Sequence, residues 1–173
     1  MDWPTVSVSV DISAPAPRVW EFVTDITLMA HFSDELQSVE WLDGTTLRLG
    51  ARFAGTNSHP LIGTWTTQSC VVDFDPPRVF AWAVGDPEAP AATWRFDVSG
   101  GGDTSRLRYT ACIGPGRSGV SILVEREPQR REQIVAHRLG IFRQGMAATL
   151  AGIKELAEST GQSGAVDDPP RHR

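Results

Sequence analysis

Apolar and polar residues alternate along much of the chain, which is the pattern of strands with one face on a core and the other in water. The alternation is clearest in residues 6–12, where valines and an isoleucine are separated by serines and an aspartate. Stretches rich in aromatic and β-branched residues then recur between turn-forming Gly, Pro, Asp and Asn residues. They predict six more strands, over residues 37–42, 47–57, 63–74, 79–84, 92–98 and 104–113.

Three segments have helical patterns instead. Ser13, followed by Pro15 and Pro17, is typical of a helix start and predicts a short helix that runs to Thr24. A second short helix is predicted over residues 27–32 and a long one over residues 128–159. His137 lies on the polar side of the long helix, which excludes it as a base facing the sheet. The apolar stripe of this helix consists of Val135, Leu139, Phe142, Met146, Leu150, Ile153 and Ala157.

Two glycine-containing motifs are interpreted as connections. Asp43-Gly44 is the residue pair that two-residue hairpins prefer, so we expect a tight turn between the second and third strands. Residues 114–119 match the G-x-G-x-x-G spacing of dinucleotide-binding loops. No parallel strand follows the last helix, however, as such a site requires. Residues 114–119 are therefore predicted to form a flexible hinge.

The order of these elements predicts an α+β fold, in which a curved antiparallel sheet of seven strands packs against the long helix and two short helices. At 173 residues, the chain is long enough for one core that needs neither disulfides nor metal. We assign residues 1–160 to a single domain. Residues 161–173, which contain almost no apolar side chains, are predicted to be a disordered tail.

The sheet face that meets the long helix is predicted to be rich in aromatic residues. These residues either close into a solid core or line an apolar cavity with Asn57, Thr67 and Tyr109 among its polar groups. We favour the cavity, because one helix cannot easily fill so long a sheet, and place its mouth at the connections after strands three, five and seven. The predicted ligand-binding residues are Phe53, Asn57, Trp65, Thr67, Phe80, Trp82, Trp94, Phe96, Tyr109, Leu139, Phe142 and Met146.

Several short segments carry a family resemblance through their order along the chain. They are ISAP at 12–15, GARF at 50–53, WTT at 65–67, FAW at 80–82 and TWRF at 93–96, with Thr149-Leu150 and Ile153-Lys154 near the end. Together, over residues 4–160, they resemble the START-like or SRPBCC superfamily, in its polyketide cyclase/dehydrase-like branch. The resemblance implies a helix-grip fold with a deep cavity for sterols, lipids or polyketides. It implies no single activity, because members include binders, cyclases, oxygenase domains and chaperone activators.

Composition narrows the possible partners. The chain has 16 basic and 21 acidic residues without a block of like charge, which argues against nucleic acid as a partner. No apolar run approaches the length of a membrane span and no secretory signal is visible, so we expect a cytoplasmic protein with no membrane insertion. Cys70 and Cys112 are isolated, and no cluster of His, Cys or carboxylates has metal-ligand spacing. We therefore predict no metal and no cofactor.

Three functions remain open at this point. The first is binding of a small, largely apolar molecule such as a lipid, sterol or polyketide. The second is a cyclase or dehydratase that acts on a polyketide-like substrate, which requires an acid or base in the pocket. The candidates are Glu35, after the second short helix, and Tyr109, a poor base at its ordinary pKa of about 10. The third is a protein-interaction module that uses the surface of the fold.

A second stripe on the long helix consists mostly of small residues. Glycine in a helix costs about 1 kcal/mol relative to alanine, so the close approach of another surface would compensate for it. That surface is either the two short helices or a second copy of the chain in a homodimer. The stripe consists of Ile134, Ile141, Gly145, Ala148 and Gly152.

Overall fold

The computed structural model describes residues 2–42, 44, 47–60 and 63–159, and in them a sheet of seven strands with helices on one side. The strands are β1 (Thr5–Ile12), β2 (Leu36–Trp41), β3 (Arg52–His59), β4 (Gly63–Asp75), β5 (Val79–Val84), β6 (Ala92–Ser99) and β7 (Ser105–Ile113). The helices are α1 (Ala16–Val23), α2 (Thr27–His31), α3 (Gly119–Arg126), a short 3₁₀ turn (Pro128–Arg130) and α4 (Arg131–Ser159).

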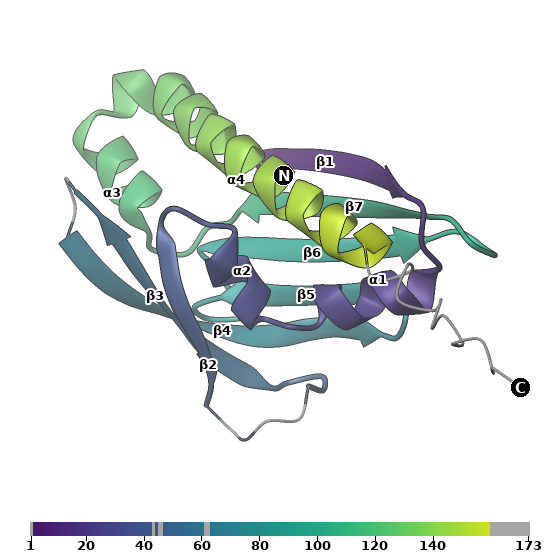
Figure 1. Cartoon of the computed structure of the whole chain (residues 1–173). Helices are drawn as coiled ribbons and strands as arrows, with labels where there is room; N and C mark the ends of the chain where they lie inside the picture. The colour runs from purple at the N-terminus through teal and green to yellow at the C-terminus, as the bar shows by residue number, and fades with distance from the viewer. Residues whose placement is uncertain (1, 43, 45–46, 61–62, 160–173) are drawn as a thin grey trace, which may run out of the picture.

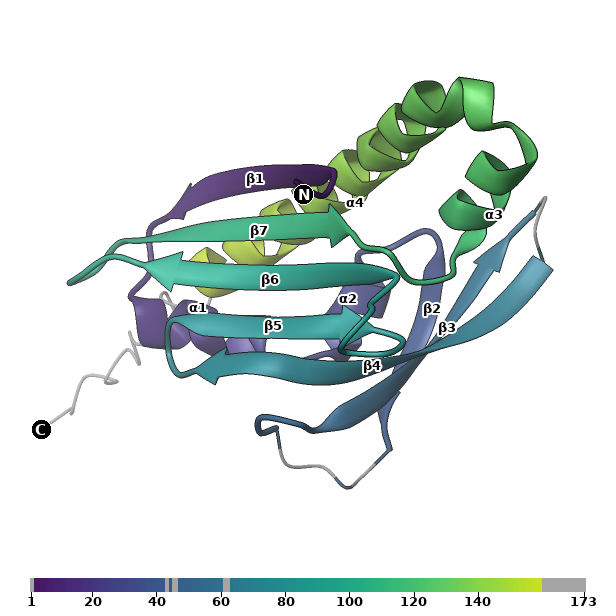
Figure 2. The ribbon, with the colours of Figure 1, turned by 180° about the vertical axis from the view of Figure 1, so that it is seen from behind.

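The sheet is antiparallel throughout and has the order β1-β7-β6-β5-β4-β3-β2. It curves, and α1, α2 and α4 lie on its concave side, whereas none of the described helices lies on the opposite side (Figures 1 and 2). Strands β2 to β7 are joined one to the next as hairpins. Strand β1, the first in the chain, forms one edge of the sheet beside β7. The predicted α+β helix-grip fold is confirmed. No helix in the described part of the chain is long and apolar enough to cross a membrane.

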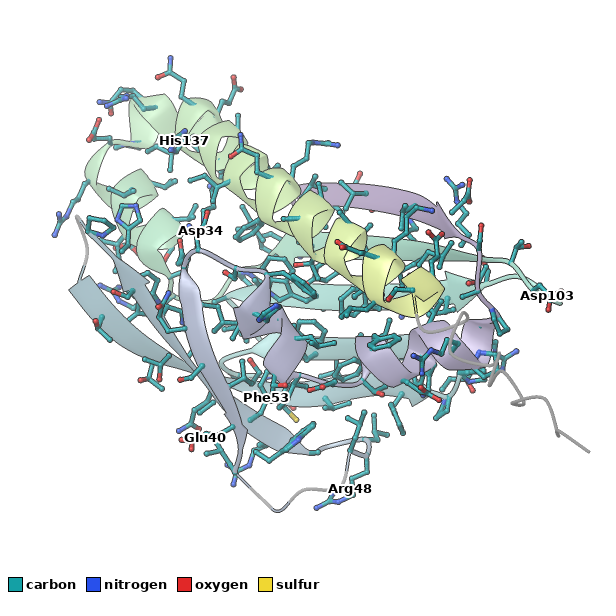
Figure 3. All side chains as sticks on the ribbon, in the orientation of Figure 1. Asp34, Glu40, Arg48, Phe53, Asp103 and His137 are labelled. Atoms are coloured by element: carbon teal, nitrogen blue, oxygen red, sulfur yellow. The ribbon has the colours of Figure 1, made fainter. Side chains whose placement is uncertain are left out.

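The core lies between the concave face and the apolar stripe of α4. Phe80 and Phe96, from neighbouring strands, are 0% and 1% exposed. His137 faces away from the sheet and is exposed, as the helical period predicts (Figure 3). The stripe of α4 is buried at Met146, Leu150, Ile153 and Ala157 and half-buried at Val135, Leu139 and Phe142. Helix α4 is thereby fixed along β1, β7 and α1.

The second stripe of α4 contacts a short helix at one position. A Cβ atom added at Gly152 would lie 2.6 Å from Cδ1 of Phe32, so α4 approaches the end of α2 closely there. The other glycine of the stripe, Gly145, has open space around it, and Ile141 is 40% exposed. Packing against the end of α2 therefore explains the small residue at Gly152. For the rest of the stripe, contact with a second copy of the chain stays a prediction.

The connection between β2 and β3 is longer than predicted. Trp41 pairs with Phe53, and the N–H of Leu42 donates to the carbonyl of Arg52 at 2.9 Å. This pairing contradicts the prediction of a two-residue turn at Asp43-Gly44. Asp43 itself lies outside the described residues. Strand β3 begins at Arg52 instead of residue 47, because Gly50 has a φ of +81° and bends the chain just before it.

Helix α3 is absent from the sequence prediction, which placed a hinge before it. Ser118 caps α3 by accepting a hydrogen bond from the N–H of Ser121 at 3.2 Å, while its own N–H donates to Oγ of Ser121 at 2.7 Å. The preceding residues form a close-packed connection and not a free hinge, since the N–H of Gly116 donates to the carbonyl of Pro90 at 2.9 Å. The capping pattern was missed because serine stands where glutamate or glutamine is usual.

The start of α1 also differs from the prediction. Pro15 is the residue before the helix, and no side chain caps its first turn. Ser13, expected at this position, instead donates its N–H to Oε1 of Glu158 at 2.8 Å. Hydrogen bonds from Lys154 and from Ser13 lower the pKa of Glu158. The end of α4 is thus tied to the connection between β1 and α1.

The glycine at position 116 is expected to be required for packing. In Gly116→Ala, the new methyl group would lie 2.6 Å from the backbone nitrogen of Ala91, and we expect the free energy of unfolding to fall by about 1–3 kcal/mol. Gly140→Ala is the matched control, because Gly140 lies within α4 with open space around it, and alanine should stabilise the helix by about 1 kcal/mol. Urea unfolding measures both changes. Effects of the same sign would contradict the packing described for Gly116.

Candidate ligand site

The predicted ligand-binding residues lie on the concave face and on the facing side of α4, and their exposure changes from one end to the other. Buried members are Phe53, Phe80, Trp82, Phe96, Tyr109 and Met146. Half-buried members are Asn57, Trp65, Thr67, Trp94, Leu139 and Phe142. The half-buried residues come from the end of β3, the start of β4, the start of β6 and the first half of α4, at the end of the molecule that α3 borders (Figure 1). This is the end of the concave face at which the mouth of the cavity is predicted.

Aromatic rings form a continuous lining across β3, β5, β6 and β7. Phe96 and Tyr109 are stacked, with ring centroids 4.0 Å apart and an angle of 15° between the rings. Trp82 lies beside both of them and is parallel to Trp94 at 6.4 Å. Trp94 in turn contacts Phe142 of α4 at 4.7 Å. The sheet and α4 thus meet through aromatic side chains at the half-buried end.

Three nearly buried residues have polar atoms that face no protein partner. Ser69, Trp82 and Tyr109 are 5%, 4% and 6% exposed, and their side chains make no hydrogen bond to another described residue. In the described part of the chain, however, no enclosed side-chain nitrogen or oxygen lacks a hydrogen-bond partner. Each of these polar atoms therefore keeps some surface that a water molecule can reach. They lie on β4, β5 and β7 of the concave face, with β6 between the last two strands.

These polar groups offer mainly hydrogen-bond donors. The indole N–H of Trp82 can only donate. Burial raises the pKa of Tyr109, so its phenol stays protonated at neutral pH and can donate a hydrogen bond but supplies no phenolate base. Ser69 adds a hydroxyl, which can donate or accept. The lining is therefore suited to an apolar molecule with acceptor oxygens, and it provides no charged group for proton transfer.

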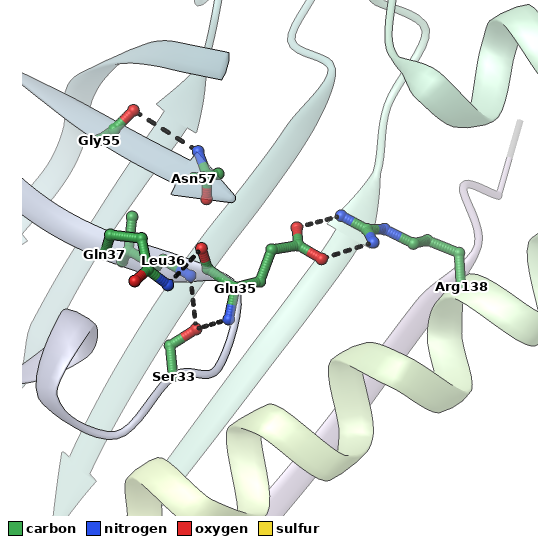
Figure 4. Close-up of polar contacts among 7 residues, drawn as sticks. All are labelled: Ser33, Glu35, Leu36, Gln37, Gly55, Asn57 and Arg138. Atoms are coloured by element: carbon green, nitrogen blue, oxygen red, sulfur yellow. Dashed lines mark hydrogen bonds and ion pairs between the residues drawn. The ribbon is translucent and has the colours of Figure 1, made fainter. Parts of the chain in front are cut away.

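Glu35 points toward α4 at the half-buried end of the concave face (Figure 4). Two hydrogen bonds fix the backbone of Glu35. Its carbonyl accepts from the N–H of Ser58 at 2.8 Å, and its N–H donates to Oγ of Ser33 at 3.2 Å. Its carboxylate accepts hydrogen bonds from both terminal nitrogens of Arg138, at 3.1 and 3.4 Å. Sequence reasoning missed Arg138, although its position four residues before Phe142 places the two on one side of the helix.

Asn57 lies inside β3, which continues to His59, and not at the end of the strand as predicted. Its Nδ2 donates to the carbonyl of Gly55 at 3.5 Å, the long limit for a hydrogen bond. The contact is visible beside Glu35 in Figure 4. The amide is thus bound only weakly to its own strand and can turn toward another partner.

A hollow lies on the outer side of the molecule, along β1 and α4. It has a volume of about 570 Å³ and shares no residue with the predicted ligand site. Two of its cations are already engaged, because Lys154 donates to the carbonyl of Asp11 at 2.8 Å and Arg106 pairs with the Asp11 carboxylate at 2.9 Å. This open groove, which three basic side chains line, is a poorer match to an apolar ligand than the aromatic lining.

Residues 4–158 match the family described as polyketide cyclase / dehydrase and lipid transport. The chain belongs to this family, as the sequence resemblance indicated. No curated protein matches the sequence.

Solved structures share the fold at low sequence identity. A polyketide cyclase-like protein from Corynebacterium glutamicum is 24% identical, with a TM-score of 0.68 over 94% of this chain and 96% of that one. The aromatase/cyclase Zhui from a Streptomyces species is 22% identical, with a TM-score of 0.65 over 94% and 98%. The di-domain aromatase/cyclase StfQ of steffimycin biosynthesis is 12% identical, with a TM-score of 0.67 over 91% of this chain and 52% of that protein. At this level of identity, the likeness establishes the fold.

Proposed function

We propose that this protein binds a small, largely apolar molecule between the concave face of the sheet and α4. The proposal rests chiefly on Ser69, Trp82 and Tyr109, whose polar atoms have no protein partner although the residues are nearly buried. A closed core would instead pair these atoms or place apolar residues there. The family description, which includes lipid transport, supports the same function.

Binding needs no chemistry beyond burial and a few hydrogen bonds. Burying a ligand of about ten methylene-sized groups contributes roughly 8 kcal/mol, at about 0.8 kcal/mol for each group. The cost of ordering the ligand then leaves a Kd on the order of micromolar. The donors of Trp82 and Tyr109 would orient acceptor oxygens of such a molecule.

A polyketide cyclase or dehydratase is the second candidate, favoured by the family description and by the aromatase/cyclases among the similar structures. That reaction needs an acid or base beside the substrate. Burial raises the pKa of Tyr109, which keeps the phenol protonated and makes it a weaker acid, and Glu35 lies at the half-buried end, away from the buried rings. Binding without turnover therefore agrees better with the lining.

The test combines native purification with a neutral fluorescent probe. We expect mass spectrometry of the denatured protein to reveal a co-purified apolar compound near one equivalent, or, if the site is empty, saturable binding of N-phenyl-naphthylamine with a Kd on the order of micromolar. This uncharged dye becomes fluorescent in apolar surroundings. A protein that carries no small molecule and gives no saturable signal would overturn the proposal in favour of an interaction module.

A further inference from the structure

The ion pair between Glu35 and Arg138 joins two distant parts of the chain at the open end of the candidate site. Glu35 comes from the connection between α2 and β2, and Arg138 from α4 (Figure 4). Their side chains are 26% and 28% exposed, so both reach water while part of each lies against protein. A molecule that enters or leaves the aromatic lining at this end passes close to the pair.

The pair is looser than most others in the described part of the chain. Its nitrogen–oxygen distances are 3.1 and 3.4 Å, whereas Arg95 reaches Asp73 at 2.7 Å and Lys154 reaches Glu158 at 2.6 Å. Charge-assisted hydrogen bonds between nitrogen and oxygen are usually about 2.7–2.9 Å long. The contact between Glu35 and Arg138 is therefore longer than is usual for such a pair.

Arg138 also belongs to the aromatic lining. Its guanidinium carbon lies 4.8 Å from the ring centroid of Phe142, and that ring contacts Trp94. The cation thus sits directly above the apolar surface that would hold the body of a ligand. A planar guanidinium, with several donors in a fixed fork, binds a carboxylate or a similar anion through two parallel hydrogen bonds.

From this arrangement we propose that Arg138 binds the anionic head group of an apolar ligand, and that Glu35 holds the same guanidinium when no ligand is bound. This inference rests on the proposed function, since it assigns an acidic amphipathic molecule to that site. The released carboxylate of Glu35 would turn into water, where it is well solvated. The aromatic residues hold the body of the ligand, and Arg138 selects an acid over its uncharged analogue.

Two dyes that differ by one charged group test the inference. Anilinonaphthalene sulfonate has the rings of N-phenyl-naphthylamine plus a sulfonate, so the ratio of their Kd values isolates the contribution of the anion. Arg138→Gln should weaken binding of the sulfonate about tenfold and change binding of the neutral dye less than about twofold. Glu35→Gln should strengthen binding of the sulfonate about threefold or more, because it removes the competing carboxylate.

Arg143→Gln is the matched control, since Arg143 is an exposed arginine on α4 that lines the outer groove. It changes the net charge equally and should leave both dyes within about twofold, because exposed charges are screened. An equal loss for both dyes in Arg138→Gln, or no loss for the sulfonate, would overturn the role of Arg138 while leaving the site itself intact. Failure of both dyes to bind the unmodified protein would instead contradict the proposed function.

Discussion

Replacement of Phe96 by alanine is expected to lower the free energy of unfolding by about 3–5 kcal/mol, the largest loss we expect from a single side chain. Phe96 is 1% exposed and stacks on Tyr109, with ring centroids 4.0 Å apart. It also lies opposite Phe80 across β5 and β6 and contacts Trp82. These neighbours are held by their strands and cannot close in, so the loss combines the transfer of the ring to water with the cavity it leaves.

Urea unfolding of Phe96→Ala, followed by far-UV circular dichroism, measures the change. Leu49→Ala is the control, because Leu49 is apolar but 61% exposed, and its truncation should change stability by less than about 0.5 kcal/mol. A loss below about 1 kcal/mol in Phe96→Ala would mean that the aromatic lining is not packed as described. Similar losses in both variants would point to the same conclusion.

Thr67→Trp is expected to weaken binding of N-phenyl-naphthylamine by about 100-fold or more, which corresponds to about 2.7 kcal/mol. Thr67 is half-buried on the concave face of β4, and its Oγ1 would lie 3.5 Å from a Cβ atom added at Gly55. An indole at this position would fill the passage between the half-buried residues and Ser69, two positions further along the strand. Because tryptophan is well accepted in strands, the melting temperature should change little.

The neighbouring residue provides the control for this blocking variant. Thr66 lies on the opposite face of the same strand and is exposed, so Thr66→Trp adds the same side chain outside the candidate site. We expect it to bind the dye like the unmodified protein. Undiminished binding by Thr67→Trp would place the dye elsewhere, and the groove along β1 and α4 would be the next site to test.

The sequence by itself predicts most of the fold, because short-range patterns specify strands and helices. Alternation identified the inward faces of β3 to β7, and the helical period identified the stripe of α4 that carries Met146, Leu150 and Ile153. Features that depend on pairing partners were not predicted correctly. The Asp43-Gly44 pair has the local preference for a tight turn, yet the pairing of Trp41 with Phe53 requires a longer connection.

The sequence indicated the aromatic side chains of the candidate site and Glu35, but not the pairing of Glu35 with Arg138. The aromatic lining follows from alternation, since every second residue of a strand shares one face. The partnership of Glu35 with Arg138 joins residues 103 positions apart, and no local pattern contains it. Alternation also places Ser69 on the concave face. Whether its hydroxyl finds a hydrogen-bond partner, however, depends on the neighbouring strands and cannot be predicted from a local pattern.

The composition and periodicity of the chain determined the curved antiparallel sheet, its apolar concave face and the helix that covers it. Only the tertiary structure decided where that regularity breaks. Strict alternation along β4 would turn Asp73 toward the core, but a bulge near Val72 shifts the register. Phe74 therefore packs against Phe80, while Asp73 reaches Arg95. Local preferences specify the elements, whereas contacts between distant segments decide their register, their ends and the charges that meet at the open end of the site.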